Sequence, residues 1–211
     1  FSIFRPSNRE YELHYLDNAA MAQVPDCVIN AMVEHDTMRR SNVKRGVHRL
    51  AEAATDAFEE ARATVADYLG VKDADEVVFT GSTTAGINIL AHSLGLMFER
   101  NDEVLISQVE HHSNIIPWQI IQQRQGIRVR YLPATPDGRI NLERAEDLIK
   151  SKTRIVAVTH GSNVTGAVTD AKALARFAHE KGALVMLDGA QTAPAGPPDI
   201  PGLEADFYVF S

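Results

Sequence analysis

The stretch that most constrains the fold is a short apolar run, residues 183–187, which ends in an acid, Asp188. Its letters, ALVML, show no alternation of polar and apolar side chains. Such a run is typical of a strand buried on both faces, as in a parallel sheet covered by helices. Ligands bind at the carboxyl ends of strands in such sheets, and a carboxylate buried there is costly unless it meets a cation. Asp188 is therefore a candidate binding residue, with a turn or helix cap as the alternative.

Similar short apolar runs recur along the chain, and segments with helical periodicity separate them. The expected strands are residues 77–79, 104–107, 129–132, 155–159, 183–187 and 207–210. The expected helices are residues 26–40, 47–69, 87–94, 113–125, 141–150 and 170–181. Because buried strands alternate with amphipathic helices, the pattern predicts an α/β fold with a mainly parallel, doubly wound sheet.

Charge and cysteine content narrow the functional classes. The chain has 211 residues and a net charge of −7, which does not favour a nucleic-acid partner. Acids flank the basic residues at 39–49, so we expect a local anion site or a solvated helix end there. No apolar run approaches the roughly 18–20 residues that span a bilayer, and no membrane partner is expected. The single cysteine, Cys27, excludes an internal disulfide and fits a reducing, cytoplasmic compartment.

A hydroxyl-rich turn, Ser82-Thr83-Thr84, follows the expected strand at 77–79 and starts a helix. Hydroxyl groups and backbone N–H groups at a positive helix end make an anion site suited to phosphate. The segment GSTTAG matches neither the P-loop nor the dinucleotide-binding glycine pattern. An ordinary helix N-cap is the alternative interpretation.

Two further polar loops follow expected strands. His111 lies in EHHSN, after the strand that ends at residue 107, and Asn163 lies in the glycine-flanked loop THGSNVTG. Adjacent histidines seldom converge on one metal and no third ligand is placed nearby, so no metal site is predicted. His111 can instead stack on a planar ring, and Asn163 can donate an amide hydrogen bond into the same crevice. For each, a satisfied polar loop is the alternative.

Together these loops meet the needs of one ligand, because successive parallel strands end at the same edge of a sheet. They offer a phosphate cradle, a flat imidazole, an amide donor and a buried carboxylate. A phosphorylated pyridinium ring requires this set: the carboxylate keeps the ring nitrogen protonated, which makes the ring an electron sink. Nicotinamide or flavin would favour glycine-rich pyrophosphate turns, which the sequence lacks.

The sequence resembles the class V aminotransferase family of pyridoxal-phosphate enzymes, and within it the group II cysteine desulfurases. The matching stretches are YLDNAAMAQVP (15–25), RGVHRL (45–50), VFTGSTTAGIN (78–88), ISQVEHHSNIIPWQ (106–119), THGSNVTG (159–166), LDGAQ (187–191) and ADFYVFS (205–211). They span nearly the whole chain. The resemblance implies the fold-type I large domain, with a seven-stranded-type sheet incomplete at its C-terminus, and pyridoxal 5′-phosphate as cofactor.

The resemblance also implies roles for residues around the phosphate and the substrate. Thr83 and Thr84 would bind the cofactor phosphate, and Ser211 would join this phosphate shell. Arg45 and His48 match a stretch near the entrance for substrate, and we expect them to contact it.

Four other residues would surround the cofactor ring. His111 would stack on the ring, and Asp188 would pair with the pyridine nitrogen, so these two are the expected catalytic residues. Asn163 would donate a hydrogen bond to the 3′ oxygen, and Gln191 would lie beside the same oxygen.

The resemblance further sets the expected domain organisation. Residues 1–15 would pack outside the main sheet, and residues 16–211 would form part of the large cofactor-binding domain. The Schiff-base lysine of the family follows a serine that matches Ser211. We therefore expect that lysine, the sulfur-accepting cysteine and the C-terminal small domain to be absent from these 211 residues, and the fragment alone to be inactive. Cys27 does not match the sulfur-accepting position.

The activity that the resemblance implies is cysteine desulfuration by a homodimer. L-cysteine would yield alanine and an enzyme persulfide, whose sulfur passes to an acceptor protein for iron–sulfur cluster assembly. One alternative is another class V enzyme: a selenocysteine lyase, an epimerase-like protein or an aminotransferase. The other is a non-catalytic remnant that binds a partner.

Overall fold

The computed structural model describes residues 14–211, and the chain divides into two compact units. The first unit ends at Val65, and the second runs from Ala66 to Ser211. The expected N-terminal segment, residues 1–15, lies almost wholly outside the described residues, and its packing stays a prediction.

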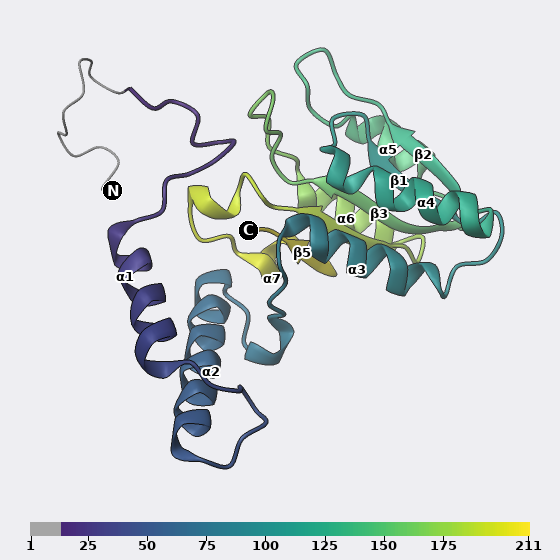
Figure 1. The fold of residues 1–211 in the computed structure, drawn as a ribbon. Helices are drawn as coiled ribbons and strands as arrows, with labels where there is room; N and C mark the ends of the chain where they lie inside the picture. The colour runs from purple at the N-terminus through teal and green to yellow at the C-terminus, as the bar shows by residue number, and fades with distance from the viewer. Residues whose placement is uncertain (1–13) are drawn as a thin grey trace. The chain divides into compact units, whose positions relative to one another are not determined.

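The first unit contains helices and no strand among its described residues. Helix α1 (Asp26–Glu34) continues into a short π-helix, η2 (His35–Arg39), and α2 (Arg49–Leu69) begins in this unit and runs past its end (Figure 1). The sequence predicted a single helix over residues 26–40; the helical path is confirmed, and its winding widens at His35.

The second unit is built on a five-stranded parallel sheet. The strands are β1 (Glu103–Ser107), β2 (Arg128–Leu132), β3 (Thr153–Thr159), β4 (Leu184–Asp188) and β5 (Phe207–Val209), in the order β2-β1-β3-β4-β5. All four neighbouring pairs run parallel. This confirms the predicted α/β class and the predicted parallel sheet.

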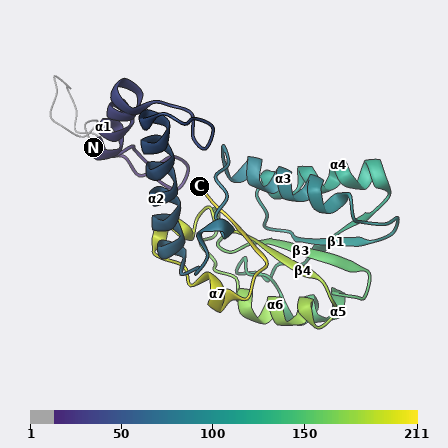
Figure 2. The ribbon, with the colours of Figure 1, turned by 90° about the horizontal axis from the view of Figure 1, so that it is seen from below.

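Helices cover both faces of the sheet, as a doubly wound fold requires (Figure 2). Helices α3 (Thr83–Gly95) and α4 (Ile116–Gln125) lie on one face, and α5 (Leu142–Leu148), α6 (Ala171–His179) and the short α7 (Ile200–Leu203) lie on the other. Ile87 and Trp118 belong to the core under the first face, and Leu105 and Leu174 to the core under the second. Burying each such side chain contributes about 1.5–3 kcal/mol.

Local sequence signals set the helix ends. The side chains of Asn141 and Asp170 accept hydrogen bonds from the N–H groups of Arg144 and Ala173, as N-cap residues do. Pro117 lies in the first turn of α4, where its missing N–H has no cost, so the helix expected over 113–125 begins at Ile116. Short 3₁₀ turns complete the unit at Ala74–Glu76, His112–Asn114 and Ala193–Ala195.

Two sequence expectations about strands are wrong. Residues 77–79 are not a strand, and Val78 is 74% exposed. A strand needs a neighbour to pair its backbone groups, and the sheet does not extend to this segment. Residues 14–211 therefore form five strands rather than the six expected from the sequence. Strand β2 was expected to be buried, but it is an edge strand, and Leu132 is its one buried residue.

Within residues 14–211, every helix is too short or too polar to cross a membrane.

Candidate functional site

Asp188 ends strand β4 in the middle of the carboxyl edge of the sheet. It pairs in register with Thr159 of β3 and with Val209 of β5. The residue is 5% exposed, and among residues 14–211 no lysine or arginine lies within ion-pair distance of its carboxylate. Burial raises the pKa of Asp188, while the Ala190 N–H, which donates to Oδ1 at 3.1 Å, and the nearby His111 oppose this shift. A buried carboxylate of this kind is a site for a cationic ligand.

The start of α3 supplies hydroxyl and N–H groups at the same edge. Ser82 caps the helix, since its Oγ accepts a hydrogen bond from the Ala85 N–H at 3.1 Å. Thr83 is 8% exposed, and its Oγ1 is buried with no hydrogen-bond partner in the described part of the chain. Thr84 is exposed. A buried hydroxyl group without a hydrogen-bond partner, beside a helix N-terminus, fits a bound anion that would accept its hydrogen bond.

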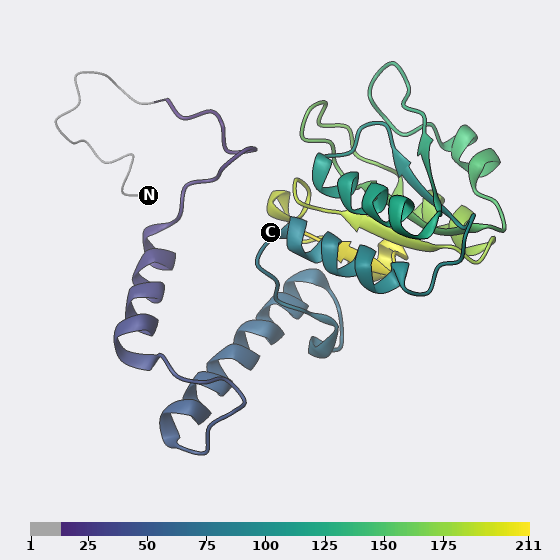
Figure 3. The same cartoon turned by 45° about the vertical axis from the view of Figure 1, so that its right-hand side comes forward.

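The C-terminal residue lies beside this helix start. Figure 1 and Figure 3 both show the C-terminus next to the first turn of α3. The first turn of α3 and the last strand, β5, are in close contact. A Cβ at Gly86 would stand only 2.6 Å from Cγ1 of Val209. Ser211 is exposed at this position.

The loop after β1 carries His111. Its side chain is exposed, and its Nδ1 accepts a hydrogen bond from the Ser113 N–H at 3.2 Å, which caps the 3₁₀ turn His112–Asn114. This hydrogen bond at Nδ1 fixes the orientation of the ring and leaves Nε2 and the two ring faces accessible. That geometry is compatible with stacking.

Glu110, next to His111, is a polar residue of this edge that the sequence reasoning missed. Its Oε1 accepts hydrogen bonds from the Ser107 hydroxyl and from the Thr159 N–H at 2.8 Å, and its Oε2 accepts from Asn114 Nδ2 at 2.7 Å. Burial raises the pKa of Glu110 to about 7, against the effect of these three donors. The available signal was an acid in the loop that follows a buried strand, a weaker form of the pattern that marked Asp188.

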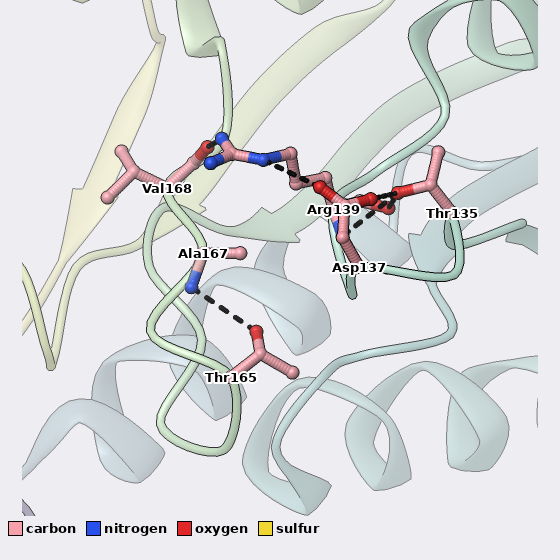
Figure 4. Close-up of polar contacts among 6 residues, drawn as sticks. All are labelled: Thr135, Asp137, Arg139, Thr165, Ala167 and Val168. Atoms are coloured by element: carbon pink, nitrogen blue, oxygen red, sulfur yellow. Dashed lines mark hydrogen bonds and ion pairs between the residues drawn. The ribbon is translucent and has the colours of Figure 1, made fainter.

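Asn163 lies in the loop after β3 and is exposed. This loop closes through a bridge between Gly161 and Val168, and its turn is held by the Ser162 side chain. A second loop, residues 134–140, packs against it: Arg139 Nη1 donates to the Val168 carbonyl oxygen at 3.4 Å (Figure 4). The Asn163 loop is thus braced from the β2 side.

Gln191 is partly buried in the turn that follows Asp188. The Thr192 N–H donates to the Gly189 carbonyl oxygen at 3.0 Å, which closes this turn. Gln191 is therefore carried by the same short segment as Asp188.

Arg45 and His48 belong to the first unit of the chain. Both are exposed, and His48 Nδ1 accepts a hydrogen bond from the Ala51 N–H at 3.3 Å at the start of α2. Their expected contact with substrate stays a prediction.

The second unit therefore has an open parallel sheet with two binding features at its carboxyl edge. The Asp188 carboxylate can bind a cationic group, and the start of α3 can bind an anion. These features define a ligand-binding α/β domain of the doubly wound class. The model of the family Aminotransferase class-V matches residues 14–211, and the chain belongs to this family.

Similar proteins are known from sequence and from structure. A probable cysteine desulfurase of Halalkalibacterium halodurans is 43% identical over 200 residues, which is 94% of this chain and 49% of that protein. A probable cysteine desulfurase of Staphylococcus aureus is 44% identical over 94% of this chain and 48% of its own length. The chain thus spans about half the length of the curated relatives it matches.

Solved structures agree with the fold. The apo cysteine desulfurase from Thermococcus onnurineus NA1 has a TM-score of 0.87 and 38% identity, covering 92% of this chain and 48% of its own. The cysteine desulfurase CsdA from Escherichia coli has a TM-score of 0.84 and 36% identity, covering 93% and 50%. SspA in complex with cysteine has a TM-score of 0.87 and 25% identity, covering 93% and 56%.

Proposed function

We propose that this chain forms the cofactor-binding part of a pyridoxal-phosphate-dependent cysteine desulfurase. The observation that carries the proposal is Asp188, a buried carboxylate with no cation in the described residues, in register between Thr159 and Val209 at the ligand-binding edge of the sheet. The likeness to proteins named cysteine desulfurase supports the choice within the family.

The residues present fit the cofactor. When bound, pyridoxal phosphate supplies an electron sink that stabilises negative charge on the carbon next to the substrate amine. Asp188 would hold the proton on the pyridine nitrogen, since an anion beside that nitrogen favours its charged form. His111 would cover one face of the ring, and Asn163 and Gln191 would contact the 3′ oxygen.

The phosphate would lie at the start of α3. There Thr83 Oγ1, which lacks a partner in the described residues, gains an acceptor, and the Thr84 hydroxyl and Ser211 complete the shell. Backbone N–H groups of the first helical turn also favour an anion.

Substrate and partners are proposed on the same basis. The substrate is L-cysteine, with Arg45 and His48 near the entrance; the solved structure of SspA is a complex with cysteine. We propose a homodimer that delivers sulfur to an acceptor protein for iron–sulfur cluster assembly. The single Cys27 is the residue-level reason for proposing a cytoplasmic compartment.

The first experiment is an absorbance titration of the protein expressed from its own gene with pyridoxal phosphate, followed by assay of alanine formed from L-cysteine and of sulfide released when an added thiol reduces the enzyme persulfide. We expect a bound-cofactor band and both products in equal amounts. Asp188→Asn, which keeps the side-chain shape, should lower turnover by at least a hundredfold while the phosphate contacts remain. Asp147→Asn is the matched control, an exposed acid paired with Arg144. Normal turnover in Asp188→Asn contradicts the proposal, and alanine without sulfide would point to another class V activity.

A further inference from the structure

Three side chains from adjacent strand ends meet beside the turn that follows Asp188. His160 follows β3, Thr192 follows β4 and Tyr208 lies in β5. Thr192 Oγ1 lies 2.8 Å from the Tyr208 hydroxyl oxygen and 3.0 Å from His160 Nδ1. The Tyr208 hydroxyl oxygen lies 3.2 Å from the same ring nitrogen. All three residues are partly buried, and we call them the hydroxyl–imidazole cluster.

The hydrogen bonds of this cluster can be assigned consistently. Burial lowers the pKa of His160, which favours the neutral ring, and in the neutral ring one nitrogen can accept a hydrogen bond. The Tyr208 hydroxyl can donate to Thr192 Oγ1. The Thr192 hydroxyl can in turn donate to His160 Nδ1, or to the Gly189 carbonyl oxygen at 3.3 Å. Both hydroxyl protons therefore have an acceptor, and the second one reaches the backbone of the turn.

The cluster is also packed against this turn. A Cβ at Gly189 would stand 2.1 Å from Cζ of Tyr208, far inside van der Waals contact, so the ring lies directly on the glycine. The backbone adds two ties: the Gly189 N–H donates to the Val209 carbonyl oxygen, and the His160 N–H donates to the Asp188 carbonyl oxygen, both at 2.8 Å. The turn is thus attached to the strands on either side of it.

The Asp188 carboxylate depends on this attachment for its direction. The hydrogen bond that fixes it in the described structure comes from the Ala190 N–H, within the same turn. If the turn shifts, the carboxylate shifts with it. We propose that His160, Thr192 and Tyr208 are positioning residues that hold the turn from Asp188 to Thr192 and so aim the Asp188 carboxylate at the pyridine nitrogen. The inference rests on the proposed function, which supplies that nitrogen.

The test removes single hydroxyl groups and observes the cofactor nitrogen. The protein expressed from its own gene is loaded with pyridoxal phosphate carrying ¹⁵N in the pyridine ring, whose NMR shift reports protonation of that nitrogen. Thr192→Val, which keeps the side-chain shape, should move the signal toward that of neutral pyridine and weaken cofactor binding by about five- to tenfold, the loss of one hydrogen bond. Thr192→Ser, which restores the hydroxyl, should behave as wild type.

A second pair of variants keeps the test independent of Thr192. Tyr208→Phe retains the ring on Gly189 and removes only the hydroxyl, so it should change the nitrogen signal in the same direction as Thr192→Val. Tyr131→Phe is the matched control: it loses a hydrogen bond from Gln119 Nε2 at 3.1 Å on β2, the opposite edge of the sheet, and should leave the signal unchanged. Circular dichroism checks that each variant folds.

The outcomes separate this inference from the proposed function. An unchanged nitrogen signal in Asp188→Asn would reject the pairing with the pyridine nitrogen and therefore both proposals. A changed signal in Asp188→Asn, with wild-type signal and affinity in folded Tyr208→Phe and Thr192→Val, would overturn the positioning role alone. If Thr192→Val does not fold, Tyr208→Phe decides the question by itself.

Discussion

At the scale of single residues, two equally buried threonines differ in what their hydroxyl groups do. Thr83 and Thr169 are each 8% exposed. Thr169 Oγ1 donates to the Thr159 carbonyl oxygen at 2.7 Å, whereas Thr83 Oγ1 has no partner among the residues the structure describes. The Thr169 hydroxyl stabilises the fold, and we assign the Thr83 hydroxyl to ligand binding.

This difference gives a prediction for replacement by valine. Thr169→Val should lower the free energy of unfolding by about 1 kcal/mol, because a satisfied hydrogen bond is lost. Thr83→Val should leave stability unchanged or slightly higher, yet weaken pyridoxal-phosphate binding by about tenfold, since hydrogen bonds to charged groups are stronger. Urea denaturation and a cofactor titration measure the two effects. Equal loss of stability in both variants would contradict the assignment.

Glu110 gives a prediction for pH. Its pKa of about 7 in the folded protein lies above the value of 4.5 for a free glutamate, so the folded state binds more protons than the unfolded state between these values. Stability therefore falls as pH rises from about 4.5 to 7, by at most about 3 kcal/mol for this group. Glu110→Gln should reduce the loss of stability between pH 5 and pH 8, measured by urea denaturation at each pH. An unchanged pH dependence would show that Glu110 ionises normally.

Residue-level prediction from sequence worked where the local pattern was sufficient. Asp188 was found because an acid directly follows a buried run, and the structure confirms its burial at the end of β4. Glu110 was missed because two residues of loop separate it from a strand end, so its return to Thr159 depends on tertiary structure. The hydroxyl–imidazole cluster was missed for the same reason, since one member lies in β5 and the other two lie in the loops after β3 and β4.

At the scale of elements, two loops at the carboxyl edge support each other. Gly138, at φ +78°, lies in the loop 134–140 and packs closely against Thr165 of the Asn163 loop. A Cβ at position 138 would stand 2.5 Å from Thr165 Cγ2. Gly182 has nearly the same backbone angle, φ +75°, but a Cβ there meets nothing within 4 Å. The two glycines differ only in what surrounds them.

Comparing the two glycines separates the cost of the left-handed backbone from the cost of steric contact with Thr165. Both Gly138→Ala and Gly182→Ala carry the cost of a left-handed alanine, about 1 kcal/mol. Gly138→Ala should cost about 1–2 kcal/mol more and speed hydrogen exchange at the Ser162 and Gly166 N–H groups, because the Asn163 loop must move. Adding Thr165→Ser, which removes the obstructing methyl group, should restore part of the protection. Identical effects of the two alanine variants would show that the loops do not brace each other.

Helices were easier to predict than strands in this chain. Caps such as Asn141 and Asp170 act within one turn, so they depend only on the local sequence. The segment 77–79 has strand-like residues, but pairing depends on a neighbour that the sequence does not name. Propensity alone therefore overestimated the sheet.

At the scale of the whole molecule, the sheet joins two cores. Trp118, the single tryptophan, is fully buried in the core on the α3 and α4 face, and Leu174 is fully buried on the other face. Tryptophan fluorescence thus reports unfolding from one side of the sheet only.

We expect the two faces to unfold together. Ile87→Ala, in the Trp118 core, and Leu174→Ala, in the opposite core, should each lower the free energy of unfolding by about 2–5 kcal/mol, both visible in the Trp118 fluorescence transition. Shared strands make this coupling, because β1, β3 and β4 each bury side chains on both faces. A Leu174→Ala transition that changes circular dichroism but leaves the Trp118 midpoint in place would show that the faces unfold separately.

The division of the chain into two units was not predicted from the sequence. Periodicity identified α1 and α2, yet it did not indicate that the chain divides near Val65. The domain boundary after residue 15 and the substrate roles of Arg45 and His48 stay predictions, because they concern parts of the chain outside the sheet unit.

The contact between Gly189 and Tyr208 limits how this protein can change by mutation. Gly189 does not have a left-handed backbone, so its constraint is the space taken by the tyrosine ring. A larger residue at position 189 is acceptable only if position 208 becomes smaller in the same molecule, and that second change removes the hydroxyl beside Thr192. Either substitution alone carries a penalty that the other can relieve. The two positions are therefore expected to vary as a pair, and a library randomised at one of them should retain glycine unless the other is randomised with it.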